Sequence, residues 1–520
     1  MSPNKPEKRH GPFKLNRRGV RLFYDIHSWL GILGGMVLFI CCFSGTLALF
    51  EHELFDWEKP QIRFAATGEM LGFDQLFERA QERLGTDKDM FVMLPNEHMR
   101  GLQARVFEDG HVEKIFLDPY TGVVVEGSGG TAFEFLTHLH TDLHLPRPFG
   151  RYLVGFLGIF MLMSLISGVM AHPKALQQLF LLRWRPRMRL TLSDLHKQLG
   201  IWGLAFGLVM AFTGAVIGLL GLFAPVMVLS AFGGDVGKAT EAFSGPNSKP
   251  TGTAAEMLSI GSLIDRAEQQ HPDFVVQSVF VRHWGDESAE VALNLDREPY
   301  RQLTAGETHR VSLVDGTTLH VSAFTERGVG TRLFGAVQPL HYGLFGGLGL
   351  KLLYFALGIA LSLGIVTGSM IWLERRKPSR TVEPQLKGQY FWLGRLHLGV
   401  CLGLVVASAL ALAAGRFQPS KVEPVFWLSW LALLIIAYGV RNAFAYARVG
   451  GFATAAILGA IALGDLMGST RTETTVQVNL VLMALGLLMA SAAALSPKQA
   501  PGAKISRPPI VAGDMAESQG

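Results

Sequence analysis

Eight long apolar segments limit the folds open to this chain more than any other feature of its sequence. Each is long enough to cross a hydrocarbon core of about 30 Å at about 1.5 Å of rise per helical residue. Only 17% of the 520 residues are charged, whereas soluble proteins average about 25%. We therefore predict a multispan α-helical membrane protein, with spans at 26–50, 151–171, 196–223, 348–373, 392–414, 425–440, 451–466 and 476–495.

Basic residues flank these segments on one side and predict the orientation of the chain. They gather in the N-terminal tail, between the second and third spans, between the fourth and fifth, and after the sixth at Arg441 and Arg448. Because Lys and Arg mark the cytoplasmic side, we predict cytoplasmic termini, an uncleaved signal anchor and outward stretches at about 51–147 and 224–345. In a bacterium these stretches lie in the periplasm, so the expected location is the inner membrane. The net charge of +5 belongs to these flanking residues and does not indicate nucleic-acid binding.

Each outward stretch predicts a small α+β module. The first has a helix at 73–85 and the second a helix at 262–272, and strand patterns follow both, with turns at 118–122 and 314–316. The three cysteines lie in predicted spans, so no disulfide is expected. The predicted organisation is a cytoplasmic tail at 1–22, a first unit at 23–173, a basic loop at 174–191, a second unit at 192–376, four further spans at 390–496 and a disordered cytoplasmic tail at 497–520.

An internal repeat relates the two units. His27 is followed by Ser44 and Gly45 at offsets of 17 and 18, and His196 is followed by Thr213 and Gly214 at the same offsets. Each unit consists of a span, an outward module and a span, so the copies share one orientation and form tandem parallel repeats. Further pairs with related spacing are His140 with Gly168, His341 with Gly368, and, as a decayed third copy of the first span, His397 with Gly415.

The histidines fall at two depths in this topology. A titratable side chain within a span is costly and predicts a functional site. Facing helices with histidines at two depths can hold two haems, because haem iron accepts axial imidazoles. The group near the cytoplasmic face comprises His27, His172, His196 and His397, and the group near the outer face comprises His138, His140, His144 and His341.

Two glycines support a flat cofactor, and other interpretations remain open. Gly31 and Gly200 each lie four residues after a histidine, on the same helix face, where a missing side chain leaves clearance. Small residues also serve plain helix packing, and a single interfacial histidine is often only a hydrogen-bonded residue. A zinc or copper site is the less favoured alternative, because only His140 and His144 have the i, i+4 spacing of a tight pair.

A set of motifs resembles a known family. The chain contains, in order, "DIHSWLGILGG", "LDPYTGVVV", "LHTDLHL", "DLHKQLGIWG" and "PLHYGLFGGLGLK". Together they resemble the PepSY-associated transmembrane family of bacterial inner-membrane proteins over roughly residues 17–380. The family includes iron-regulated proteins and haem-containing reductases for siderophore-bound iron. The resemblance implies PepSY-like outward modules and places the family's histidine positions at His27, His140, His172, His196 and His341.

The resemblance implies two b-type haems, one near each membrane face. By depth and repeat symmetry we predict that His140 and His341 ligate the outer haem, and that His27 and His196 ligate the inner haem. The alternates are His172, His144 and His397. Haem iron is the only metal expected, and no residue is assigned as a catalytic acid, base or nucleophile.

The implied activity is reduction of a ferric siderophore or another ferric chelate in the periplasm, by electrons that cross the membrane. No G-x-G-x-x-G follows a predicted strand, so the donor is a quinol or a separate cytoplasmic reductase. Two alternatives stay open: a non-redox membrane protein that regulates a peptidase or binds peptides, and a siderophore or metal transporter. Asp465 is the only carboxylate well placed in the spans for transport, which makes the transporter less favoured.

Overall fold

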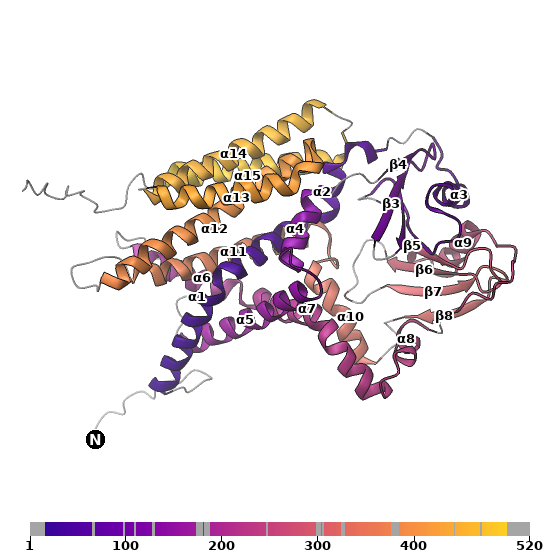
Figure 1. Cartoon of the computed structure of the whole chain (residues 1–520), viewed down its shortest axis with the longest axis horizontal. Coiled ribbons are helices and arrows are strands. Elements are labelled where there is room, and N and C mark those ends of the chain that lie inside the picture. The colour runs from indigo at the N-terminus through magenta and orange to yellow at the C-terminus, as the bar shows by residue number, and fades with distance from the viewer. Residues whose placement is uncertain are drawn as a thin grey trace, which may run out of the picture.

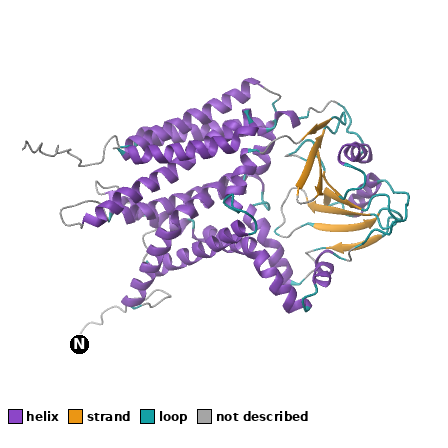
Figure 2. Cartoon of the chain, in the orientation of Figure 1, coloured by secondary structure: helices purple, strands orange, loops and turns teal. Residues whose placement is uncertain are grey.

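The computed structural model describes residues 16–496, except for 65–67, 97–98, 109–110, 127–130, 173–179, 181–187, 246–247, 298–302, 304–305, 324–327, 376–383, 441 and 469–470. The predicted tail at 497–520, and most of the predicted tail at 1–22 and loop at 174–191, lie outside the described residues. Helices occupy one part of the molecule and the strands gather at one end of it (Figures 1 and 2).

The described residues contain eight helices that are long and apolar enough to cross a membrane. The predicted class of multispan helical membrane protein is therefore confirmed, and a lipid bilayer surrounds these helices. The sixth and seventh spans are longer than the predicted 425–440 and 451–466. The eight helices are α1 (Arg17–Ala48), α5 (Phe149–Ala171), α7 (Leu204–Phe232), α11 (Gly347–Glu374), α12 (Pro384–Phe417), α13 (Val422–Gly439), α14 (Ala443–Gly468) and α15 (Glu473–Leu495).

The third predicted span is divided in the structure. Helix α6 (Met188–Trp202) ends at Gly203, where the backbone leaves helical geometry (φ −85°, ψ 1°), and α7 begins at the next residue. His196 therefore belongs to α6 and not to the long apolar helix. The predicted boundary was wrong because the apolar run continues across the break and hides it.

Helices α1, α5, α7 and α11, with α6, form a bundle from both units of the repeat. In membranes, small residues allow close packing of helix backbones. A Cβ atom on Gly218 of α7 would lie 2.6 Å from the Cα atom of Gly155 on α5, and one on Gly158 would lie 2.9 Å from the backbone nitrogen of Ala215. These glycines bring α5 and α7 into direct contact, and so join the first unit to the second. We call α1, α5, α6, α7 and α11 the repeat bundle.

The strands of the described residues form one eight-stranded antiparallel sheet of order β4-β3-β2-β1-β5-β6-β7-β8. The α+β character of the two predicted modules is confirmed, but their sheets are continuous, because β1 pairs with β5 in the register Met90↔Val281. Helices α3 (Phe73–Leu84) and α9 (Ile260–Gln270) cover one face, away from the membrane helices (Figure 1). The strands are β1 (Met90–Met93), β2 (Leu102–Glu108), β3 (His111–Leu117), β4 (Val124–Glu126), β5 (Phe274–Arg282), β6 (Glu290–Arg297), β7 (Glu307–Ser312) and β8 (Thr318–Ser322).

Short helices connect the sheet to the spans. Helix α4 begins in a capping box, in which the Thr131 hydroxyl accepts from the Glu134 backbone and the Glu134 carboxylate accepts from the Thr131 backbone. Helices α4 and α10 return the chain from the sheet to the bundle, so they set where their histidines lie. The connecting helices are α2 (Glu51–Glu58), η1 (Pro60–Ile62), α4 (Ala132–Thr141), α8 (Val236–Ser244) and α10 (Val329–Tyr342), and a further short helix, η4 (Pro419–Lys421), links α12 to α13.

Helices α12 to α15 form a C-terminal unit against one side of the repeat bundle. Helix α12 contacts α1, α4 and α11, and its buried residues Leu404, Ala407 and Ala411 share a core with Phe39 of α1 and Leu136 of α4. The C-terminal unit therefore packs against the helix that carries His140.

Candidate cofactor sites

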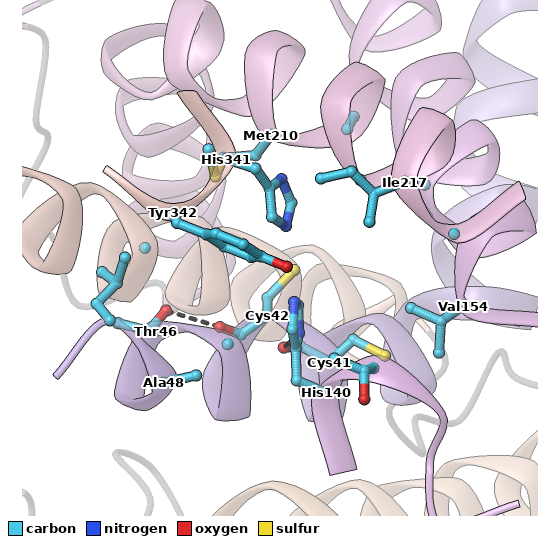
Figure 3. Close-up of a pocket in the computed structure, with 18 of the residues that line it drawn as sticks. Cys41, Cys42, Thr46, Ala48, His140, Val154, Met210, Ile217, His341 and Tyr342 are labelled. Carbon is cyan, nitrogen blue, oxygen red and sulfur yellow. Dashed lines mark hydrogen bonds between the residues drawn. The ribbon is translucent and has the colours of Figure 1, made fainter. Parts of the chain in front are cut away.

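The first candidate site is a pair of facing imidazoles near the sheet, from His140 on α4 and His341 on α10. Their ring centroids are 6.0 Å apart and their planes differ by 20°. Figure 3 shows the two rings pointing toward one another across a pocket. We call His140 and His341 the sheet-side pair. The structure brings together the two residues predicted to ligate the outer haem.

The second pair lies toward the other end of the bundle, from His27 on α1 and His196 on α6. The ring centroids are 5.9 Å apart and the planes differ by 54°. His27 and Gly45, which lies against His140, are eighteen residues apart on α1, which is about 27 Å at about 1.5 Å per residue. We call His27 and His196 the distal pair. The two pairs are therefore separated by about the thickness of a hydrocarbon core.

A hydrogen bond at Nδ1 orients three of the four imidazoles through a backbone carbonyl. His27 donates to the oxygen of Ser164 (2.8 Å), His140 to that of Cys41 (2.9 Å) and His196 to that of Gly364 (2.9 Å). A carbonyl only accepts, so Nδ1 carries the proton in each of these rings and Nε2 carries the lone pair. Imidazoles that ligate metals usually have this arrangement.

A hydroxyl group orients the fourth imidazole. The Thr213 hydroxyl lies 2.9 Å from Nδ1 of His341 and donates to the carbonyl oxygen of Val209 at 2.6 Å. Its single proton is used in that bond, so it accepts from His341. All four rings therefore present an unprotonated Nε2.

Each of the four rings lies against a glycine that follows a serine or threonine. A Cβ atom added to these glycines would lie between 2.6 and 3.0 Å from the nearest ring atom, so any larger residue there would require the ring to move. The hydroxyl of the preceding residue bonds the backbone of its own helix in every case. The contacts are Ser44-Gly45 with His140, Ser167-Gly168 with His27, Thr213-Gly214 with His341, and Thr367-Gly368 with His196.

A cavity of about 410 Å³ surrounds the sheet-side pair. Its volume is in the range of small-molecule pockets, which is about 300–1,000 Å³. Its wall is mainly apolar, but it includes Thr137, whose buried hydroxyl has no hydrogen-bond partner. Arg151 and Lys351 also line it. The cavity thus offers two free imidazole nitrogens, an unpaired hydroxyl and two cations to one ligand.

The donor set fits a haem better than a bare metal ion. Two imidazoles that bind one metal from opposite sides, at about 2 Å per nitrogen, have ring centroids about 6 Å apart, which matches both pairs. A bare zinc ion needs about four ligands, and the described residues contain no group of three or more His, Cys, Asp or Glu side chains that could hold a metal. Haem iron needs only axial ligands from the protein.

The alternate ligands lie elsewhere. His172 is exposed at the end of α5, close enough to His27 and His196 for their charges to interact. His144 donates from Nε2 to the Phe135 carbonyl (2.9 Å) and packs beside Trp427. His397 lies against Cys401 of its own helix, with Nδ1 3.7 Å from the sulfur atom.

The remaining predicted glycines behave differently from one another. A Cβ atom on Gly31 or Gly200 would meet no atom within 4 Å, so their role as clearance for a cofactor stays a prediction. Gly415, the expected third copy of the repeat glycine, contacts the Glu58 carboxylate and Ala132 instead of a histidine. The sequence repeat at His397 and Gly415 is therefore not a structural repeat of the histidine contact.

Asp465, the carboxylate considered for a transport role, is held by three side chains of the protein. Its carboxylate accepts from Arg63 (3.1 Å), Arg416 (2.7 Å) and Asn479 (2.7 Å) and is 2% exposed. These contacts join α14, α12 and α15 to η1 at the sheet side of the bundle. A carboxylate that is fully hydrogen-bonded to fixed partners is not available to bind a transported ion.

Ser44-Gly45 and Thr213-Gly214 define the repeat in the sequence, but their spacing does not show what the glycines contact. Together with Gly168 and Gly368, these glycines form the surfaces against which the histidines pack. The available signal was the fourfold occurrence of Ser-Gly or Thr-Gly inside the spans, where the glycine follows a histidine by 18 residues in the first span of each unit and by 28 or 27 residues in the second.

Comparisons with known proteins agree with this architecture. Residues 24–375 match the model of the family described as the PepSY-associated TM region. The chain is also similar to the uncharacterized protein PA4219 of Pseudomonas aeruginosa, with 32% identity over 319 residues, which covers 59% of this chain and 78% of that protein. The family match spans both histidine pairs, the sheet and the repeat bundle, and ends before the C-terminal unit. The chain therefore belongs to the PepSY-associated transmembrane family.

Proposed function

We propose that this protein is a b-type cytochrome of the bacterial inner membrane that carries electrons across the bilayer and reduces a ferric chelate, such as a ferric siderophore, in the periplasm. The observation that carries the proposal is the presence of two facing imidazole pairs, each with the spacing of a bis-histidine metal site, toward opposite ends of one bundle. A haem at each pair would supply one-electron oxidation and reduction of its iron.

The residues of the chain hold and tune such groups. The carbonyl oxygens of Ser164, Cys41 and Gly364 fix three of the rings, so that Nε2 keeps its lone pair without a conformational change. All four rings are half-buried among the mainly apolar helices of the bundle, which favours electron transfer through the protein over side reactions in bulk water. With a haem at each pair, electrons from a quinol or a cytoplasmic reductase would enter at the distal pair and would leave at the sheet-side pair.

The sheet offers a place for an anionic chelate. Its face opposite α3 and α9 looks toward the membrane helices (Figure 1). On that face the Arg105 guanidinium lies 4.2 Å from the centre of the Phe91 ring, and its buried Nε has no hydrogen-bond partner. Arg105 makes no ion pair within the described residues, and Lys114 is directly across the ladder. A flat anion could therefore stack on Phe91 and pair with Arg105.

The spectrum of the purified full-length chain tests the proposal. We expect about two haems per chain and a b-type α band after reduction with dithionite. His140→Ala and His27→Ala should each remove about one haem. His138→Ala is the matched control, because His138 lies two residues from His140 on α4 and is half exposed.

Two results would contradict this function. A colourless preparation from haem-supplied cells would leave a non-redox PepSY protein or a transporter as the better interpretation. Retention of both haems in His140→Ala and His27→Ala would refute the ligand assignment. If haem is bound, Arg105→Gln should raise the KM for an anionic ferric chelate and leave that for a neutral chelate unchanged.

A further inference from the structure

The cavity at the sheet-side pair is lined by two cations from equivalent positions of the repeat. Arg151 on α5 is seventeen residues before Gly168, and Lys351 on α11 is seventeen residues before Gly368. Both side chains line the same cavity. Since Gly168 and Gly368 hold the distal histidines, about 25 Å of helix places both cations at the sheet end of their helices.

A charged side chain within a membrane-spanning helix costs free energy, and pairing it with an opposite charge offsets that cost. Lys351 is 8% exposed and its ammonium donates to the Glu53 carboxylate at 2.7 Å. The second oxygen of Glu53 is buried and has no hydrogen-bond partner. Arg151 is half-buried and makes no hydrogen bond or ion pair with any described residue. Equivalent positions thus carry one paired and one unpaired cation.

We propose that Arg151 and Lys351 bind the two carboxylates of a dicarboxylate macrocycle whose iron is held by His140 and His341. A haem carries two propionates, and two cations related by the repeat match two carboxylates related by the symmetry of the macrocycle. Charge-assisted hydrogen bonds to carboxylates are about twice as strong as neutral ones, and Arg can bind a carboxylate through two parallel bonds. This inference rests on the proposed function.

The two cations have unequal effects on the bound group. Reduction adds one negative charge at the iron, so a nearby positive charge favours the reduced form and raises the midpoint potential. No carboxylate of the described residues opposes the charge of Arg151, whereas Glu53 opposes that of Lys351. Arg151 therefore raises the potential of the sheet-side haem more than Lys351 does, and Glu53 lowers it.

Redox titration of the purified full-length protein tests this inference. Arg151→Met should lower the midpoint potential of the sheet-side haem more than Lys351→Met, and Glu53→Gln should raise it, while the distal haem keeps its potential. Transfer of haem to apomyoglobin should become about tenfold faster in Arg151→Met, which corresponds to the loss of about 1.4 kcal/mol. Arg332→Gln is the charge-matched control, because Arg332 is exposed on α10 outside the cavity lining.

Haem dimethyl ester separates the carboxylate contacts from other effects. Its propionates are esterified, so protein reconstituted with it should show the same rate of haem loss in the natural chain and in Arg151→Met. Haem-loaded variants with the potentials and loss rates of Arg332→Gln would overturn this inference and leave the proposed function intact. A natural chain that binds no haem would overturn both.

Discussion

The repeat bundle and the C-terminal unit both bury polar side chains among membrane-spanning helices, but they satisfy them differently. In the C-terminal unit, Asp465 is enclosed by Arg63, Arg416 and Asn479, and Asn479 also accepts from the indole of Trp57 (2.8 Å). In the repeat bundle, each paired imidazole makes one fixed hydrogen bond and keeps its other nitrogen free.

The difference distinguishes structural polar groups from candidate sites. A buried group whose hydrogen-bonding capacity is satisfied within the protein contributes to docking and specificity. A buried group with a free donor or acceptor carries a desolvation penalty that a ligand can relieve. Burial alone does not distinguish a structural polar group from a candidate site, since Asp465 and His397 are both buried and neither belongs to a facing pair. The free Nε2 atoms, arranged in facing pairs, separate them.

The largest effect that this comparison predicts is on Asp465. Replacing it with Ala removes the carboxylate that lies between the buried side chains of Arg63 and Arg416, which costs about 3–5 kcal/mol. Thermal unfolding in detergent should show Asp465→Ala far below the natural chain, with Asp465→Asn between them. His27→Ala in cofactor-free protein should lose only about 1 kcal/mol, the value of one hydrogen bond. Equal losses of stability in Asp465→Ala and His27→Ala would show that the two regions do not differ in how they satisfy their polar groups.

A second prediction concerns the glycines that hold the rings. A Cβ atom on Gly45 would lie 2.6 Å from the His140 ring, so Gly45→Ala should displace that ring, lose the sheet-side haem and destabilise the protein by about 1–3 kcal/mol. Gly31→Ala is the control, because that Cβ atom meets no protein atom within 4 Å. If Gly31 gives clearance to a cofactor, Gly31→Ala lowers only the haem content of the distal pair. Haem-to-protein ratios and unfolding temperatures distinguish the two variants.

The sequence predicted much of this arrangement, for physical reasons that differ by residue. The spans follow from hydropathy, and the histidine pairing follows from equal spacing in two units of equal orientation, as at His27 and His196. The break at Gly203 could not be predicted, because the apolar pattern continues through it. The joining of β1 to β5 was also missed, since pairing across the seam depends on the register of Met90 with Val281 and not on either strand alone.

Glu58 lies where the two regions meet and gives a third effect, which depends on pH. Its carboxylate accepts from the Ala132 backbone at the start of α4 (2.8 Å), packs against Gly415 of α12, and has one unpaired oxygen. Burial raises the pKa of Glu58 from 4.5 to about 8, and the nearby charge of Glu134 adds to the rise. The hydrogen bonds from Ala132 and Phe133 and the charge of Lys59 act in the opposite direction. Between pH 4.5 and about 8, Glu58 of the folded chain therefore keeps a proton that Glu58 of the unfolded chain has lost.

Because of this retained proton, the stability of the folded chain decreases as the pH rises. Stability should fall as the pH rises from about 4.5 to 8, by at most about 1.4 kcal/mol per pH unit, and level off above pH 8. Glu58→Gln should remove this slope, so its advantage over the natural chain grows from pH 5 to pH 8. Unfolding temperatures across this range check the prediction, with exposed Glu82→Gln as control. A parallel pH profile in Glu58→Gln would show that Glu58 does not hold the proton.

The smallest predicted effect is that of a substitution at His397. It tests whether a cofactor site requires a facing pair of histidines or only a buried histidine. His397 is 9% exposed and shares the spacing of the repeat, yet its ring contacts Cys401 of its own helix and does not face a second histidine. His397→Gln should therefore leave the haem content, the α band and both midpoint potentials unchanged, while His196→Gln loses the distal haem. Loss of a haem in His397→Gln would show that a histidine outside the facing pairs can serve as a ligand. The pairing of rings across the repeat would then no longer be sufficient to identify the ligands in this bundle.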